Sequence, residues 1–319
     1  MEIARLDNLL DREPHPRGPV TVALWEPPNS SFPPPDWLPV RNIDLVIAAG
    51  RSEDESTENQ PLIVVPDPLE ELQRIDTELQ RRPAAAGILV RLLRATAGVP
   101  LETALEMESL AYGTLLGGID FKDWLRYRKR PSPSRTVPTD PLFLERSDDR
   151  LVITLNDPER HNAYSARMRD ALVEALAVPL ADDSISAVEI TGAGRSLCSG
   201  ADLGEFGSAS DLAAAHLVRT QQHVGRALAA LGERVHVRAH GACIGAGIEI
   251  PAFASRITAA PGTFFRLPEL QMGLIPGAGG CVSIPRRIGR FRTLYMVLSG
   301  MTVRADRALR WGLIDTLED

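Results

Sequence analysis

The spacing of apolar residues divides the chain into three parts. Up to residue 65, short apolar runs at 20–25, 43–49 and 62–65 predict strands, separated by Pro-rich or polar stretches. Between residues 68 and 127, apolar residues recur every three or four positions, a spacing typical of amphipathic helices. After residue 140, short apolar runs alternate with helical patterns. Strands that feed helices through short Gly-containing turns indicate an α/β layered core.

We expect these parts to be separate regions. Residues 1–65 form a small α/β-like N-terminal extension, of which residues 1–18 are polar and loosely ordered. Residues 66–130 form a helical region, and the basic, Pro/Ser-rich residues 131–141 form a linker to the core at 142–319. The helices expected in the helical region cover residues 69–79, 88–93, 103–116 and 121–127.

Within residues 142–319, the apolar runs predict five strands and four helices in alternation. Polar groups at the carboxyl ends of such strands commonly form active sites, because there the chain passes from strand to helix. The expected strands are 151–155, 187–191, 235–239, 256–260 and 263–267, and the expected helices are 164–176, 213–231, 244–253 and 276–288.

Composition and charge narrow the class of protein. The chain is 44% hydrophobic and 24% charged, which is normal for a soluble globular protein. A net charge of −7 argues against a nucleic-acid partner held mainly by phosphate contacts. Three widely spaced cysteines fit a reduced, cytoplasmic protein better than a disulfide framework. No run approaches the roughly 18 apolar residues that a membrane span needs.

Two glycine-rich turns each follow an expected strand. They read GAGRSLCSGAD, at 192–202, and GACIGAG, at 241–247. Each turn exposes backbone N–H groups where a helix begins, and two such groups directed at one point form an oxyanion hole. Taken singly, such a turn is more often an ordinary tight turn.

Two glutamates, Glu249 and Glu269, lie twenty residues apart in mostly apolar sequence. Carboxylates in such surroundings are either paired with a cation or used in acid–base chemistry. A structural interpretation would pair Glu249 with Arg256 or Arg266. For two glutamates between two glycine turns, we favour catalysis.

Several motifs between residues 142 and 317 resemble the crotonase (enoyl-CoA hydratase/isomerase) superfamily. ITLNDPERHNAYSARMRDAL resembles its first strand, turn and helix, and SLCSGADL resembles its first oxyanion element. HGACIGAGIEI resembles its second oxyanion element, and FRLPELQMGLIPGAGG resembles the segment that carries a second glutamate. RALRWGLIDTLE resembles the end of the core. The resemblance implies a crotonase-like ββα spiral core of the α/β class, with a helical cap supplied from the N-terminal side.

The resemblance also implies residue roles. Glu249 and Glu269 match the two carboxylates that enoyl-CoA hydratases use together, and the N–H groups of Ala201 and Ala246 match the oxyanion donors. Family members usually carry Gly at the second donor, so Ala246 departs from the pattern. The positions implied for substrate or CoA binding are Arg160, Asn162, Ala163, Ser199, Gly200, Asp202, Leu203, Phe206, Gly245, Pro268, Met272 and Gly277. Phe265 is a further expected lining residue.

The function implied first is hydration of 2-enoyl-CoA. Within the superfamily, the alternatives are a double-bond isomerase and a reaction like that of the dihydroxyphenylacetyl-CoA dioxygenases. The paired glutamates argue against the dioxygenase. A third hypothesis is a non-catalytic acyl-CoA-binding subunit. The partner is then an acyl-CoA, and the resemblance implies no metal, no tightly bound cofactor beyond the coenzyme A thioester, and a homo-oligomer, trimeric or hexameric.

The helical region also resembles part of the superfamily. Typical crotonases continue beyond the core into C-terminal helices that cover the CoA site, whereas this sequence ends at residue 319. Residues 66–127 resemble those helices, which predicts a permuted arrangement. In that arrangement Arg126, Arg128 and Lys129 would approach the CoA phosphates.

Overall fold

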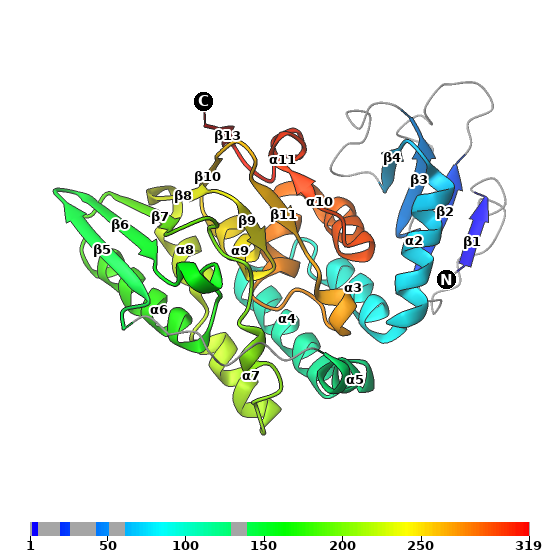
Figure 1. Cartoon of the computed structure of the whole chain (residues 1–319), viewed down its shortest axis with the longest axis horizontal. Helices are drawn as coiled ribbons and strands as arrows, with labels where there is room; N and C mark the ends of the chain where they lie inside the picture. The colour runs from blue at the N-terminus through cyan, green and yellow to red at the C-terminus, as the bar shows by residue number, and fades with distance from the viewer. Residues whose placement is uncertain (1, 6–19, 26–42, 51–60, 129–138, 319) are drawn as a thin grey trace.

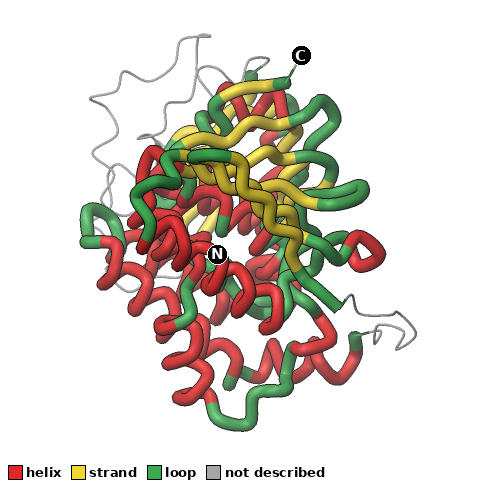
Figure 2. The backbone as a smooth tube through the Cα atoms, turned by 90° about the vertical axis from the view of Figure 1, so that its left-hand side faces the viewer, coloured by secondary structure: helices red, strands yellow, loops and turns green. Residues whose placement is uncertain are grey.

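The computed structural model describes residues 2–5, 20–25, 43–50, 61–128 and 139–318. Strands and helices are both abundant, as the sequence predicts for a mixed α/β protein. The chain forms three sheets in this part, and most of the strands lie together above a layer of helices (Figure 2).

The largest sheet has six strands in the order β13-β10-β8-β7-β6-β5. All neighbours are parallel except β5 and β6, which form an antiparallel hairpin at one edge. Buried apolar residues alternate along β6, because one face of this strand packs on the core. The strands are β5 (Leu142–Ser147), β6 (Arg150–Leu155), β7 (Ala187–Gly192), β8 (Val235–Ala239), β10 (Arg256–Ala259) and β13 (Thr316–Leu317).

A second sheet of three short strands follows the turns of the spiral, in the order β12-β11-β9. β9 (Ala242–Ile244) pairs in parallel with β11 (Phe264–Arg266), and β11 pairs antiparallel with β12 (Val303–Arg304). Residues 240–241, between β8 and β9, therefore carry the chain from one sheet to the next. This change of sheet places residues 245–249 directly after β9, at the end of a strand of the second sheet.

The helices of the core differ from the prediction at four places: two expected helices are interrupted or shortened, the last expected helix runs to residue 299 instead of 288, and a helix at 305–311 was not predicted. The helix expected at 213–231 is interrupted at residues 222–223, which separate α7 from α8. The helix expected at 244–253 has only four residues, because Pro251 starts a short 3-10 turn. The helices are α6 (Ala166–Ala181), α7 (Leu212–Gln221), α8 (Val224–Leu231), α9 (Ala246–Glu249), α10 (Gly280–Ser299) and α11 (Ala305–Trp311), with 3-10 turns at Pro158–Arg160, Leu203–Glu205, Gly232–Arg234, Pro251–Phe253 and Glu269–Met272.

The N-terminal part forms a parallel four-stranded sheet in the order β1-β2-β3-β4, with α2 lying beside it (Figure 1). Residues 2–5 are its first strand, so the expectation that residues 1–18 are loosely ordered is wrong for them. The linker expected at 131–141 falls largely outside the described residues. The elements are β1 (Glu2–Arg5), β2 (Thr21–Trp25), β3 (Leu45–Ala49), β4 (Leu62–Val65), α2 (Pro68–Arg81), α3 (Pro83–Ala95), α4 (Leu101–Leu116) and α5 (Ile119–Tyr127).

The helices α2–α5 pack directly on the core. α2 and α3 lie against α10, and α4 lies against both α7 and α10. In Figure 1, α3 and α10 stand between the small N-terminal sheet and the large sheet, while α4, α5 and α7 gather below. Leu89 of α3 and Phe121 of α5 belong to the same buried cluster as Ile153 of β6. One continuous apolar core therefore joins these helices to the sheets.

Candidate active site

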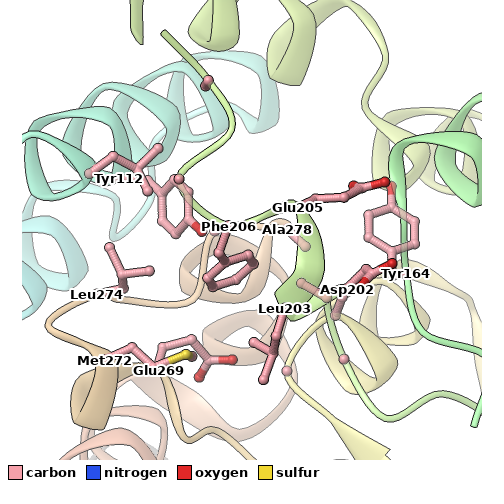
Figure 3. Close-up of a pocket in the computed structure, with 18 of the residues that line it drawn as sticks. Tyr112, Tyr164, Asp202, Leu203, Glu205, Phe206, Glu269, Met272, Leu274 and Ala278 are labelled. Carbon is pink, nitrogen blue, oxygen red and sulfur yellow. The ribbon is translucent and has the colours of Figure 1, made fainter. Parts of the chain in front are cut away.

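A cavity of about 900 Å³ lies between the core and the helices α4 and α5. Its wall combines segments that are far apart in the sequence: α4 and α5, residues 199–212, the junction of α7 and α8, residues 244–249 and residues 268–278. In Figure 3, Tyr112 approaches from α4, whereas Glu269, Met272 and Leu274 come from the 269–274 segment. The volume is in the range of pockets that hold small-molecule ligands.

Two backbone segments lie side by side at the base of this cavity. Cys198 and Cys243 form a parallel bridge, in which the N–H of Ile244 donates to Cys198 O at 3.1 Å. Gly200 and Gly247 allow this approach, because a Cβ at Gly200 would lie 2.9 Å from Ile244 O and one at Gly247 would collide with Cys198 O. The two predicted oxyanion segments are thus brought together.

Ala201 and Ala246 lie in the cavity wall on these two segments. Within the described residues, neither amide N–H makes a hydrogen bond to the protein. Ala246 is the first residue of α9, and the positive φ of this turn, 52°, belongs to Gly245 instead. Alanine at position 246, where family members usually carry Gly, therefore causes no backbone strain, and its N–H stays available at the cavity wall.

Glu249 is the last residue of α9 and is only 2% exposed. Its Oε2 accepts the N–H of Ala278 at 2.7 Å and that of Gly280 at 3.0 Å. Burial raises the pKa of Glu249, and these donors oppose the rise because they favour the ionised form. The structural interpretation is not supported: Glu249 makes no ion pair within the described residues, and Arg266 donates to Gly300 O.

Glu269 begins a 3-10 turn and is 7% exposed. Its Oε2 is buried and has no hydrogen-bond partner in the described structure. Burial raises the pKa of Glu269 well above its usual value, and the neighbouring charge of Glu249 raises it further. The protonated form of Glu269 is therefore favoured.

Gly245 lies between the two carboxyl groups. A Cβ at this position would lie 2.6 Å from Glu269 Oε1 and 3.7 Å from Glu249 Oε1. Because both distances start from the same point, Glu269 Oε1 and Glu249 Oε1 are separated by at most their sum. Both carboxyl groups line the cavity beside Ala246.

Most of the other predicted binding positions also line the cavity: Ser199, Gly200, Asp202, Leu203, Phe206, Gly245, Pro268, Met272 and Gly277. Four predicted positions do not. Phe265 is completely buried in β11. Arg160 forms ion pairs with Asp157 and Asp202, the latter at 2.7 Å.

Asn162 and Ala163 hold the loop beside the cavity instead of lining it. Asn162 is fully buried, and its amide donates to Ala193 O and Ser196 O, both at 2.9 Å. Ala163 is 9% exposed and belongs to the same turn. Arg160 thus holds Asp202, and Asn162 holds residues 193–196, while the binding roles expected for Arg160, Asn162 and Ala163 stay predictions.

The structure adds polar residues that the motifs do not contain. Tyr112 of α4, Arg219 of α7 and His223 at the α7–α8 junction all line the cavity. The Arg219 guanidinium lies 5.2 Å from the centre of the Tyr112 ring. Burial lowers the pKa of His223 to about 4, so this histidine is neutral near pH 7. These residues lie in helical sequence outside the motifs, so no motif identifies them.

A third acid, Glu108 of α4, lies behind the cavity wall and is 2% exposed. The sequence pattern could have identified Glu108, because it lies four and three positions after Ala104 and Leu105, on the apolar face of the helix predicted at 103–116.

The cysteines and histidines offer no other site in the described residues. Cys198, Cys243 and Cys281 are free and buried, and burial raises the thiol pKa values of all three. No group of three His, Cys, Asp or Glu residues in the described ranges could hold a metal ion. His216 contacts Ser109 and Glu106 instead.

Residues 145–318, more than half of the chain, match the family model described as enoyl-CoA hydratase/isomerase. The chain therefore belongs to the enoyl-CoA hydratase/isomerase family, and its fold is that of the crotonases. The predicted resemblance is thereby confirmed.

Known relatives carry several activities. The 2,3-dehydroadipyl-CoA hydratase of Escherichia coli K12 is 35% identical over 173 residues, which are 54% of this chain and 67% of that protein. The 1,2-epoxyphenylacetyl-CoA isomerase of the same strain is 34% identical over 169 residues, covering 51% and 64%. The chain thus spans about two thirds of the length of these relatives.

A solved structure of an enoyl-CoA hydratase from Mycobacterium smegmatis matches with a TM-score of 0.52 and 29% identity. The match covers 56% of this chain and 70% of the Mycobacterium smegmatis chain. None of the described helices combines the length and the apolar character that crossing a membrane requires.

Proposed function

We propose that this protein hydrates 2-enoyl-CoA thioesters to 3-hydroxyacyl-CoA. The observation that carries the proposal is the pair of buried glutamates in unequal hydrogen-bonding environments, beside two unpaired backbone N–H groups. Membership of the enoyl-CoA hydratase/isomerase family supports an acyl-CoA substrate.

In the proposed reaction, the thioester carbonyl oxygen accepts the N–H groups of Ala201 and Ala246. Attack of water on Cβ moves an electron pair toward this oxygen, so negative charge develops there in the transition state. Preorganised amide donors stabilise that charge, and removing a single donor typically costs about 3 kcal/mol. The enolate then takes a proton at Cα, which restores the thioester.

We assign the base to Glu249 and the acid to Glu269. Glu249 accepts two N–H groups, which stabilises its ionised form, so it can remove a proton from the attacking water. Glu269 Oε2 accepts none, which favours the protonated form that delivers a proton to Cα. The proton taken by Glu249 balances the one given by Glu269, and exchange between them or with solvent resets the pair.

The proposed pH dependence follows from the same assignment. Burial raises the pKa of Glu249 to about 7, so kcat/KM rises as the pH increases through this value and the base ionises. Burial and the charge of Glu249 raise the pKa of Glu269 well above its usual value, so activity falls again on the alkaline side, where this acid loses its proton. We expect a bell-shaped profile.

The test uses crotonyl-CoA and follows the loss of the conjugated enoyl absorbance. Glu249→Gln and Glu269→Gln each lower kcat/KM at least about 10²-fold, the usual size of a general acid–base contribution. Glu106→Gln, an exposed glutamate on α4, is the matched control and keeps wild-type activity. Unchanged activity in the double variant would end the proposal, and acyl-CoA binding without turnover would favour the non-catalytic hypothesis.

A double-bond isomerase is the second candidate, because the matching family is that of enoyl-CoA hydratases and isomerases. Moving a double bond transfers a proton between two carbons and needs only one carboxylate. Incubation of the protein with a 3-enoyl-CoA distinguishes the two. An isomerase forms 2-enoyl-CoA that accumulates, whereas a hydratase leaves the 3-enoyl-CoA unchanged.

We also propose that α2–α5 supply the cap of the acyl-CoA site and that the protein is a homo-oligomer. Six lining residues of the cavity come from α4 and α5 and a seventh, Gly117, from the turn between them, which supports the cap: Tyr112, Leu116, Phe121, Lys122, Trp124 and Leu125. The mass in solution, measured by light scattering, tests the oligomer.

A further inference from the structure

Glu108 is a buried acid that the proposed chemistry does not use. It lies in the middle of α4, is 2% exposed, and is not among the residues of the cavity wall. It therefore has no contact with a substrate in the cavity. A buried carboxyl group is retained in a core only where several hydrogen bonds compensate its loss of water.

The partners of Glu108 lie at the start of α10. Its Oε1 accepts the N–H of Gly279 at 2.7 Å, and its Oε2 accepts the N–H of Cys281 at 2.8 Å. Glu249 Oε2 accepts the N–H groups of Ala278 and Gly280, which alternate with them. Four successive amides, from residue 278 to residue 281, thus point to two carboxyl groups, one from α4 and one from α9.

This turn is shaped around the two acids. Gly279 has a φ of 103°, which L-residues with side chains rarely adopt. A Cβ at Gly280 would lie 2.5 Å from Glu249 Cγ. If Glu108 no longer accepted its two N–H groups, both would be buried without a partner, which is unfavourable. The turn would then move, and with it the two donors of Glu249.

The surroundings of Glu108 also make it an electrostatic neighbour of the acid pair. Glu249 of α9, Glu269 of the 3-10 turn and Cys281 of α10 all interact with its charge, as do Tyr112 on its own helix and the cation Arg219 of α7. Burial and the charge of Glu249 raise the pKa of Glu108 well above its usual value, and the N–H groups that both its oxygens accept oppose the rise. Once Glu108 is ionised, its charge raises the pKa of Glu269, after the larger effects of burial, of Glu249 and of Arg266, which lowers it.

We propose that Glu108 is a positioning residue of the acid–base pair: it fixes the amide donors of Glu249 and, once ionised, places negative charge beside Glu269. This inference rests on the proposed hydratase function. It makes the helical region a functional part of the site, since the N-terminal helix α4 holds the turn that carries the catalytic hydrogen bonds.

The experiment compares Glu108→Gln with Glu106→Gln, which changes an exposed glutamate on the same helix. In Glu108→Gln we expect kcat for crotonyl-CoA to fall about 10-fold or more, with KM within about twofold of wild type. The alkaline limb of the pH profile shifts to lower pH, because removing a negative neighbour lowers the pKa of Glu269. Glu108→Asp keeps the charge and therefore the alkaline limb, although its shorter reach lowers kcat. Glu106→Gln changes neither.

A second measurement does not depend on turnover. Infrared titration of the carbonyl band of protonated carboxyl groups follows the buried acids directly in the intact protein. We expect its midpoint to move to lower pH in Glu108→Gln, beyond the loss of the Glu108 band itself, and to stay unchanged in Glu106→Gln. Wild-type protein that turns over no enoyl-CoA would refute the hydratase function and leave this titration to decide on Glu108. A Glu108→Gln protein with a lower melting temperature but with unshifted titration and pH profile would overturn the proposal.

Discussion

Gly245 has a backbone conformation that only glycine adopts readily, and its missing side chain leaves room for a catalytic oxygen. Its φ and ψ are 52° and −121°, and the oxygen in question is Glu269 Oε1. Gly232, at the end of α8, has nearly the same angles, 58° and −130°, but nothing lies within 4 Å of the position a Cβ would take. Substitutions at Gly245 and Gly232 therefore cause similar backbone strain, but the new side chain contacts Glu269 at Gly245 and no neighbouring atom at Gly232.

Gly245→Ala is therefore expected to lower kcat about 10–100-fold, because the new methyl displaces the Glu269 carboxyl group, and small displacements of catalytic groups have effects of this size. Gly232→Ala is the control. Both variants lose roughly 1–3 kcal/mol of stability from backbone strain, measured by urea unfolding. Only Gly245→Ala loses activity under conditions where the protein is folded. Equal activities of the two variants would contradict the importance of this contact.

The sequence was most informative for residues that belong to motifs. It predicted Glu249, Glu269, Ala201 and Ala246, and the structure places all four in one cavity wall. Their catalytic roles stay predictions. Residues such as Tyr112 and Arg219 could not be predicted, because only the packing of α4 against α7 brings them to the cavity.

Among the secondary-structure elements, breaks and edges were harder to predict than the elements themselves. The helical pattern continues through residues 213–231, but the chain bends at His223, whose ring packs edge-on against Phe253 at 5.7 Å. β5 was missed because it is an edge strand with mostly exposed side chains, so it has no apolar run. The helix break at His223 and the edge strand β5 both depend on tertiary contacts, which the local sequence pattern does not contain.

The loop between β7 and α7 is held by the end of α5. The Arg128 guanidinium donates to Phe206 O at 3.3 Å and also to Leu203 O, and it lies 5.0 Å from the Trp124 ring centre. Leu203 and Phe206 line the cavity, so this contact fixes part of its wall. Lys129, which was expected to approach CoA with Arg126 and Arg128, lies outside the described residues.

Arg128→Met should release this loop while keeping the apolar stem of the side chain. We expect KM for enoyl-CoA to rise about 3–10-fold, since two charge-assisted hydrogen bonds to the loop are lost, and kcat to change less. Arg81→Met, which removes an exposed partner of Glu78 on α2, is the control. Kinetic constants measured over a range of crotonyl-CoA concentrations give the result, and an unchanged KM would exclude a role of Arg128 in shaping the cavity.

For the whole molecule, the regions predicted from composition do not correspond to separately packed parts of the structure. The helical region and the core were expected as separate regions joined by a linker. In the structure, the buried apolar cluster runs without interruption through both, and Glu108 of α4 bonds to amides 171 and 173 positions farther along the chain. Changes in composition along the sequence indicate where a linker lies. Contacts between residues more than 170 positions apart depend on the folded structure, so composition does not predict them.

Because the two parts share one core, cutting the chain between them should not separate them. A protease site placed within the predicted linker, residues 131–141, allows cleavage after folding. We expect the fragments to co-elute in gel filtration and to keep kcat within about twofold, since the buried apolar surface between them resembles a domain interior more than a domain interface. They should part only in denaturant. The same chain without the protease site, treated identically, is the control. Fragments that separate in buffer would show that the helices act as an independent domain, and a cleaved complex without activity would show that the cap must be covalently joined to the acid pair it covers.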